Sequence, residues 1–134
     1  MERFGFKLTL IIGLLGWGIC YLLFAFGNIE TSSWMLFLGI VLHGIYYDFF
    51  FVSGQIYTDA KAGKKFRSAA QGLITLATYG FGMLIGFRIA GTLTDYYILP
   101  NGHDWEQIWL KPAIFAFTVL ILFLYTFKNK PINN

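Results

Sequence analysis

The sequence predicts an all-α membrane protein with four transmembrane helices, and two observations carry this prediction. The 134 residues are 57% hydrophobic and only 13% charged, whereas soluble domains are about a quarter charged. Four apolar runs lie at 8–27, 34–57, 69–97 and 108–127. Each is long enough for a helix to cross roughly 30 Å of hydrocarbon. We therefore expect a single membrane domain over residues 1–134, embedded in a lipid bilayer.

The segments between the runs carry turn and helix-cap residues. Residues 28–33 offer N-cap hydroxyls before the second run. The polar segment 59–67 is expected to be a basic cytoplasmic loop, and it is followed by Ser68 and Gln71 at the spacing of a capping box. Residues 99–103, Leu-Pro-Asn-Gly-His, predict a turn before the fourth run.

Most of the ten lysines and arginines gather on one side of the predicted membrane. They are Arg3, Lys7, Lys61, Lys64, Lys65, Arg67, Lys128 and Lys130. By the positive-inside rule, both termini and the basic loop lie in the cytoplasm, and Trp34, Trp105 and Trp109 mark the outer interface. Because the charges stand beside apolar runs, the net charge of +3 indicates topology and not a nucleic-acid partner.

No sequence motif indicates catalysis, a cofactor or a metal. The patterns GxSxG, HExxH and GxxxxGK[ST] are absent, as is a Cys–His pairing. A glycine-rich stretch at 80–86 lies inside an apolar run without a preceding strand, which argues against a dinucleotide turn. Cys20 is the single cysteine, so an internal disulfide is excluded. We expect a protein that is not an enzyme.

One carboxylate, Asp48, interrupts the second run near mid-membrane. A charge there costs about 2.5–3.5 kcal/mol on insertion scales, so Asp48 should face protein or a water-filled cavity. At about 100° per residue, Gly44, Tyr47 and Gln55 lie on or beside the same face. An aromatic ring, an acid and an amide together suit a polar ligand with a planar ring.

We therefore expect Tyr47, Asp48 and Gln55 to bind the substrate and Asp48 to couple transport to a proton. The alternative is that Asp48 only ties helices together through a hydrogen bond. His43 is rotated about 140° from Asp48, which favours a packing or interfacial role over a proton relay. Arg88 either extends its side chain toward the outer interface or forms an ion pair with Asp95, seven residues further on. We favour the ion pair, with a structural role.

The third run is rich in small residues, and Gly82-x-x-x-Gly86 is a close-approach motif for helix packing. The same run carries polar groups on or near one stripe. These groups either line a cavity or hydrogen-bond to neighbouring helices; they are Gln71, Thr75, Thr78 and Tyr79.

The order of motifs in residues 46–86 is distinctive. An aromatic-Asp-Phe-Phe core at 47–50 is followed by Ser53-Gly54, by Arg-Ser-Ala-Ala-Gln-Gly at 67–72, and then by a glycine-rich helix. This segment resembles the late helices of the nucleoside:proton symporter family of the major facilitator superfamily. Residues 3–7 and 104–110 are similar to the segments before helix nine and at the start of helix twelve of that family.

The resemblance implies that the four runs are helices nine to twelve of a twelve-helix transporter, whose two halves rock around a central site. It implies nucleosides and protons as substrates, and it implies that Tyr47 and Asp48 contribute to the nucleoside site. Family members often have Phe where this chain has Tyr47. The chain is then expected to be a fragment, in the bacterial inner membrane, that does not transport without the missing helices of the parent transporter.

Two other functions remain open from the sequence. One is a small four-helix drug or metabolite exporter that acts as a dimer, although the acid of such proteins lies in the first helix. The other is a non-transporting membrane assembly subunit, in which Asp48, Gly82 and Gly86 contact helices of a partner subunit.

Overall fold

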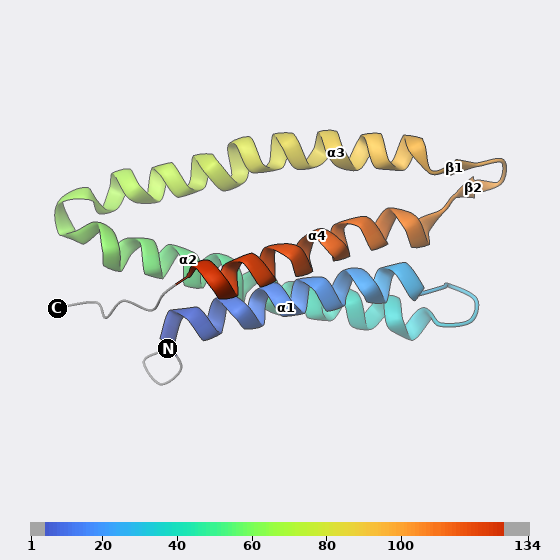
Figure 1. Ribbon diagram of the computed structural model, residues 1–134, viewed down its shortest axis with the longest axis horizontal. Helices are drawn as coiled ribbons and strands as arrows, with labels where there is room; N and C mark the ends of the chain where they lie inside the picture. Colours follow the sequence, from blue (N-terminus) through green and yellow to red (C-terminus); the bar gives the residue numbers. More distant parts are fainter. Residues whose placement is uncertain (1–4, 128–134) are drawn as a thin grey trace.

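The computed structural model describes residues 5–127, which fold into long apolar helices (Figure 1). Three helical stretches are long and apolar enough to cross a membrane: Gly5–Phe26, Ser33–Tyr96 and Trp105–Thr126. Each contains an 18-residue segment of high mean hydropathy, 2.2, 1.8 and 2.0 respectively. The predicted all-α membrane fold is therefore confirmed for this part of the chain. The elements in order are α1 (Gly5–Phe26), α2 (Ser33–Thr75), the π-helical segment η1 (Leu76–Gly82), α3 (Met83–Tyr96), β1 (Ile98–Leu99), β2 (Gly102–His103) and α4 (Trp105–Thr126).

The chain reverses direction inside α2, at Gly63. Gly63 is the one residue of this element with non-helical backbone angles, φ 67° and ψ 171°. Figure 1 shows the chain turning back on itself at this end. The reversal is much tighter than the loop expected over 59–67, and Ser68 lies inside the helix instead of capping it. We call residues 33–62 the first arm and residues 64–96, which include η1 and α3, the returning arm.

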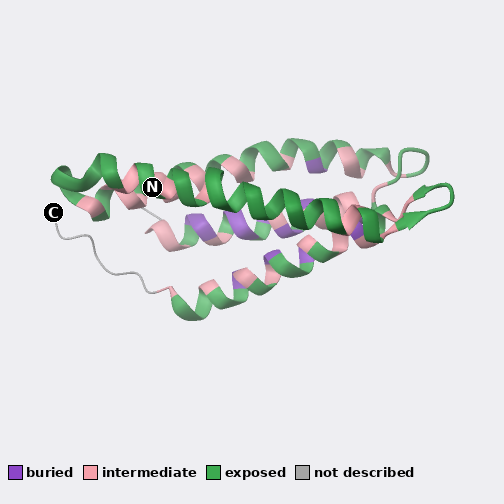
Figure 2. Cartoon of the chain, turned by 90° about the horizontal axis from the view of Figure 1, so that it is seen from above, coloured by how far each residue is buried: buried purple, intermediate pink, exposed green. Residues whose placement is uncertain are grey.

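The core is formed where α1 packs against the first arm and against α4. Glycines of α1 permit this packing, because a Cβ at Gly13 would lie 3.1 Å from Phe50 Cβ and one at Gly18 would lie 2.7 Å from Phe117 Cζ. A Cβ at Gly16 would overlap the ring of Tyr46. Figure 2 shows the buried residues along this interface; the apolar ones are Leu10, Leu14, Cys20, Ala25, Ile108, Ala113, Ala116 and Leu120.

The returning arm is more exposed than the core formed by α1, the first arm and α4, and α3 has no buried residue. No atom outside the local helix lies within 4 Å of a Cβ built at Gly86 or Gly91. A Cβ at Gly82 would lie 3.1 Å from the Ala77 carbonyl oxygen of its own segment. A packing role for Gly82 and Gly86 has no contact with another described helix to support it, and it therefore stays a prediction.

The end of the molecule opposite Gly63 is closed by short connections. The turn expected at 99–103 is confirmed: it is a two-residue hairpin in which Ile98 pairs with His103. Helix α4 begins earlier than the sequence predicted, because the Asp104 side chain accepts a hydrogen bond from the Gln107 backbone N–H (3.2 Å) and caps the helix. Ser32 is the N-cap residue of α2, but its hydroxyl bonds to the Asn28 N–H and the Phe26 carbonyl instead of capping the helix.

A glycine-to-alanine exchange tests the close packing of α1. We expect Gly16→Ala to destabilise the helical bundle by about 1–3 kcal/mol, because the added methyl group must displace the Tyr46 ring. The measurement is unfolding in detergent micelles followed by the helical circular dichroism signal. Gly91→Ala is the matched control: it adds the same methyl group to open helix surface and should be neutral or stabilising by up to about 1 kcal/mol. Equal stability of the two variants would contradict the packing argument.

Candidate functional site

The first and returning arms meet in an aromatic cluster around Tyr47. The hydroxyl groups of Tyr47 and Tyr79 form a hydrogen bond across the two arms. Phe51 lies against both rings, with centroid distances of 4.5 Å to Tyr47 and 5.5 Å to Tyr79. Tyr47 is half-buried by these contacts. The ring that the sequence placed at the substrate site is thus held by two neighbours.

Helix geometry explains how the three rings come together. Tyr47 and Phe51 are four residues apart on the first arm, a spacing that places side chains one above the other on one helix face. Tyr79 lies in η1, where π-helical turns replace α-helical ones. A π-helical turn changes the angular positions of the side chains around it, and such turns frequently occur at functional sites.

Asp48 lies on a different face from the aromatic cluster. One residue beyond Tyr47, it is turned by about 100° around the helix and is exposed on the surface of this chain, as is Gly44. Tyr47 and Gln55 are instead half-buried. The four residues expected on one face therefore differ in exposure: Tyr47 and Gln55 are half-buried, whereas Gly44 and Asp48 are exposed.

A second link between the arms lies nearer to Gly63 and consists of polar groups. The Gln71 side-chain N–H donates to the backbone carbonyl oxygen of Gln55 (2.8 Å) and to Asp59 Oδ1 (3.4 Å). Arg67 Nε pairs with Asp59 Oδ2 at 2.8 Å. Of the four polar residues predicted to line a cavity or bond to neighbouring helices, Gln71 and Tyr79 bond to the first arm. The Thr78 hydroxyl bonds within its own arm, to the Ile74 carbonyl (2.7 Å).

The remaining polar residues of the runs lie away from this region or at its edge. His43 is exposed and borders the cluster, with its ring centroid 6.3 Å from that of Tyr47 and 6.4 Å from that of Trp17. Arg88 and Asp95 are both exposed, and they do not form the ion pair that was expected. Among residues 5–127, no three His, Cys, Asp or Glu side chains stand close enough to hold a metal ion.

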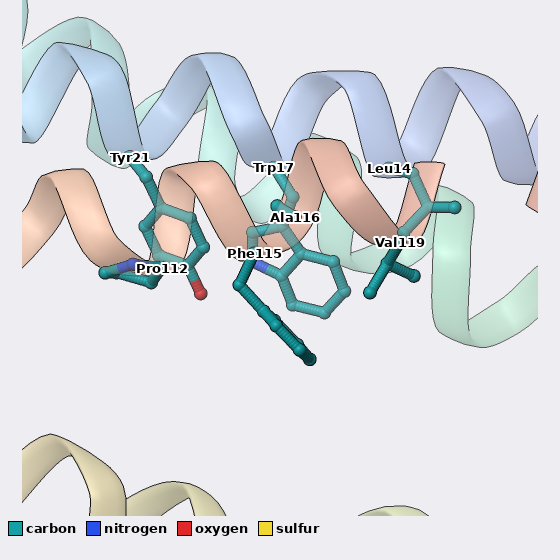
Figure 3. A pocket seen from close by; sticks show the side chains of 7 residues that line it. All are labelled: Leu14, Trp17, Tyr21, Pro112, Phe115, Ala116 and Val119. Atoms are coloured by element: carbon teal, nitrogen blue, oxygen red, sulfur yellow. The ribbon is translucent and has the colours of Figure 1, made fainter. Parts of the chain in front are cut away.

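Two cavities of the described chain lie away from the predicted site. One of about 220 Å³ lies between α1 and α4 (Figure 3) and is lined by Leu14, Trp17, Tyr21, Pro112, Phe115, Ala116 and Val119. Its lining carries no charge. A wider one of about 870 Å³ opens at the end opposite Gly63, where Glu30, His103 and Glu106 contribute polar groups beside Trp105 and Trp109.

Sequence reasoning identified Tyr47 but not its partner. Tyr79 was recognised only as one of several polar residues on a stripe, because its place opposite Tyr47 depends on the reversal at Gly63 and on the π-helical segment. A signal was nevertheless present in the sequence. Two tyrosines in adjacent antiparallel apolar runs, each about 16 residues from the reversal, lie at matching depth.

Comparison with known proteins gives consistent matches over nearly the whole chain. A family model described as "Nucleoside H+ symporter" matches residues 1–131. The chain is 39% identical to the putative nucleoside transporter YegT and 30% identical to the xanthosine permease, both of Escherichia coli (strain K12). Each alignment covers 96% of this chain, and 32% and 31% of the respective relative.

A solved structure has the same arrangement of helices. The crystal structure of the nucleoside transporter NupG superposes with a TM-score of 0.87 at 28% identity, over 96% of this chain and 32% of that one. The chain thus spans about a third of the length of the relatives it matches, and these relatives are transporters and permeases, not enzymes. Because the family match covers nearly every residue, this chain belongs to the nucleoside H+ symporter family.

Proposed function

We propose that this chain supplies the last four membrane helices of a proton-coupled nucleoside transporter, that Tyr47, Asp48 and Gln55 contribute to its nucleoside site, and that Asp48 carries the coupling proton. The first arm and the returning arm are then two of these helices, α1 and α4 the others. Membership of the symporter family favours this function over a small dimeric exporter. The relatives YegT and NupG are described as nucleoside transporters, and the proposal extends this substrate class to the present chain.

The observation that carries the proposal is the position of Asp48. Its carboxylate lies within an apolar helix and on a face that the other described helices leave uncovered. A charge facing hydrocarbon is costly, so ionisable residues in membrane helices face a bundle interior or a water-filled path and are used in proton transfer. Asp48 therefore fits a site whose opposite wall is supplied by other helices of the transporter.

Tyr47 supplies the aromatic surface next to this acid. Its ring is fixed by Phe51 and by the hydroxyl bond to Tyr79, which lowers the entropy that would be lost when a planar base stacks on it. Asp48 is the next residue along the helix and can accept hydrogen bonds from a bound polar ligand. Ring and acid together provide stacking and hydrogen bonding, the two interactions that a nucleoside requires.

Transport by this mechanism needs more than these four helices. Alternating access in such transporters results from one half of the molecule moving against the other around a central site. This chain corresponds to about a third of its relatives, and α3 has an exposed apolar surface that further helices can cover. We accordingly assign transport to the assembly that contains this chain together with the remaining helices, in the cell membrane.

The distribution of charge supports an orientation with the Gly63 end in the cytoplasm. Lys61, Lys64 and Lys65 surround the reversal, whereas Glu30, Asp95 and Glu106 lie toward the opposite end. Lys7 lies at the same end as the reversal, as does the C-terminal end of α4, because Lys7 Nζ donates to the Leu124 carbonyl (3.2 Å). By the positive-inside rule, we expect the start of α1 and the end of α4 on the cytoplasmic side.

Replacement of the proposed proton carrier tests the mechanism. In the transporter that contains these residues, we expect Asp48→Asn to reduce proton-driven accumulation of radiolabelled nucleoside to the level seen with a protonophore, because the amide cannot release a proton. Uptake should also lose its dependence on external pH, because residue 48 can then no longer carry a proton.

The matched control is Asp95→Asn, which removes an equally exposed carboxylate near the end of α3. Its uptake and pH dependence should equal those of the unchanged protein. Accumulation by Asp48→Asn at the unchanged rate, with the pH dependence retained, would exclude Asp48 as the coupling residue.

Removal of the stacking ring tests the nucleoside site. Stacking of a base on an aromatic side chain contributes about 1–3 kcal/mol, so Tyr47→Ala should raise the KM for nucleoside uptake by about 5- to 100-fold. Tyr125→Ala, which removes a tyrosine that is 82% exposed on α4, should leave KM unchanged. An unchanged KM in Tyr47→Ala would remove Tyr47 from the site.

Cysteine labelling tests the orientation. In a Cys20→Ala background, a membrane-impermeant maleimide should label Asn101→Cys in intact cells and Lys64→Cys only after the cells are broken, because these positions lie at opposite ends of the bundle. The reverse pattern would invert the proposed topology.

A further inference from the structure

The bond between the hydroxyl groups of Tyr47 and Tyr79 has a feature that a simple packing contact lacks. Each tyrosine hydroxyl has one hydrogen and can also accept, so the two groups together hold two hydrogens. Their mutual bond uses one hydrogen and leaves the other free to donate. Within the described chain, neither hydroxyl has another hydrogen-bond partner.

The placement of this bond ties it to the proposed nucleoside site. Tyr79 touches the first arm beside Phe51, so it fixes the Tyr47 ring from the side of the returning arm. Asp48 is the next residue after Tyr47 and accepts hydrogen bonds when ionised. The free hydroxyl hydrogen of the tyrosine pair adds a donor to a region that otherwise offers an acceptor and a ring.

We propose that Tyr79 is a positioning and specificity-determining residue for nucleoside binding: it fixes the ring of Tyr47 for stacking, and the hydroxyl pair donates its remaining hydrogen to a carbonyl oxygen of the base. This inference rests on the proposed function, since it assumes that Tyr47 stacks on the nucleoside. It extends that function by assigning a residue of the returning arm to the site and by naming the type of base that the pair favours.

The π-helical segment η1 is the structural reason that Tyr79 can take this role. Segment η1 carries Tyr79 four residues after Thr75, at the point where α2 ends. Both ends of η1 continue into α-helix, so the change in helical geometry is confined to the turns that present Tyr79. Tyr79 thus contacts Tyr47 and Phe51 of the first arm, whereas the polar groups that join the two arms lie nearer to Gly63.

The experiment removes single hydroxyl groups from the whole transporter that contains this chain. Tyr79→Phe keeps the ring against Phe51 and deletes only the hydroxyl, so the transporter should still fold, with an unfolding temperature in detergent lowered only slightly by the loss of one hydrogen bond. We expect the KM for inosine to rise by about 2- to 10-fold with an unchanged maximal rate, because one neutral hydrogen bond is lost. The variants Tyr47→Phe and Tyr47→Phe/Tyr79→Phe should show the same rise, since both hydroxyls belong to one interaction.

The base carbonyl is tested with purine riboside, which lacks the carbonyl oxygen of inosine. The unchanged transporter should have a lower KM for inosine than for purine riboside, and Tyr79→Phe should bring the two values together. Tyr96→Phe, at an exposed tyrosine of α3, is the control and should change neither KM.

An inosine KM in Tyr79→Phe equal to that of the unchanged transporter would overturn the inference, as would a ratio of the two KM values that does not move. Additive effects of the two hydroxyl deletions would also overturn it. These outcomes are distinct from failure of the proposed function, which would appear as full proton-driven uptake by Asp48→Asn.

Discussion

The positive φ angle of Gly63 is the constraint on which the arrangement of this chain depends. Helical backbone would otherwise continue, and residues 33–96 would form a rod of roughly 95 Å, far longer than a bilayer is thick. A left-handed φ at this one residue folds the rod into two antiparallel arms without a long loop. Because the arms return side by side, Arg67 reaches Asp59, Gln71 reaches Gln55 and Tyr79 reaches Tyr47.

The two sides of the first arm have different physical character. On one side, glycines of α1 allow Tyr46 and Phe50 to approach its backbone, and α4 completes a closely packed core. On the other side, the returning arm touches the first arm through the tyrosine pair and the Gln71–Asp59–Arg67 group, and α3 has no buried residue. The first arm, which is part of the closely packed core, therefore carries Tyr47 and Asp48, while the helix that touches Tyr47 has few contacts with the other described helices.

Asp48 lies on the less closely packed side of the first arm and is exposed. If it faced the core with α1, its carboxylate would require a partner among apolar side chains, and an unpaired buried charge is costly. It is instead on the surface that the described helices leave open, one residue from a ring that two neighbours hold in place. The chain belongs to the nucleoside H+ symporter family, and the relatives it matches are about three times as long.

The sequence by itself determined the membrane class, the apolar runs and the ends that carry positive charge, and it led to the proposal of Tyr47 and Asp48 as site residues, because each of these follows from composition or from spacing along one helix. It placed Gly44, Tyr47, Asp48 and Gln55 on one face, and it expected a loop at 59–67 and a salt bridge between Arg88 and Asp95. Only the tertiary structure decided these points. The backbone angles of Gly63 made the turn one residue wide, and the position of the returning arm divided the face, half-burying Tyr47 and leaving Asp48 open. Tyr79, in the π-helical segment, is the partner of Tyr47. A contact between residues 32 positions apart depends on how two helices lie together, and the periodicity of either helix alone does not predict it.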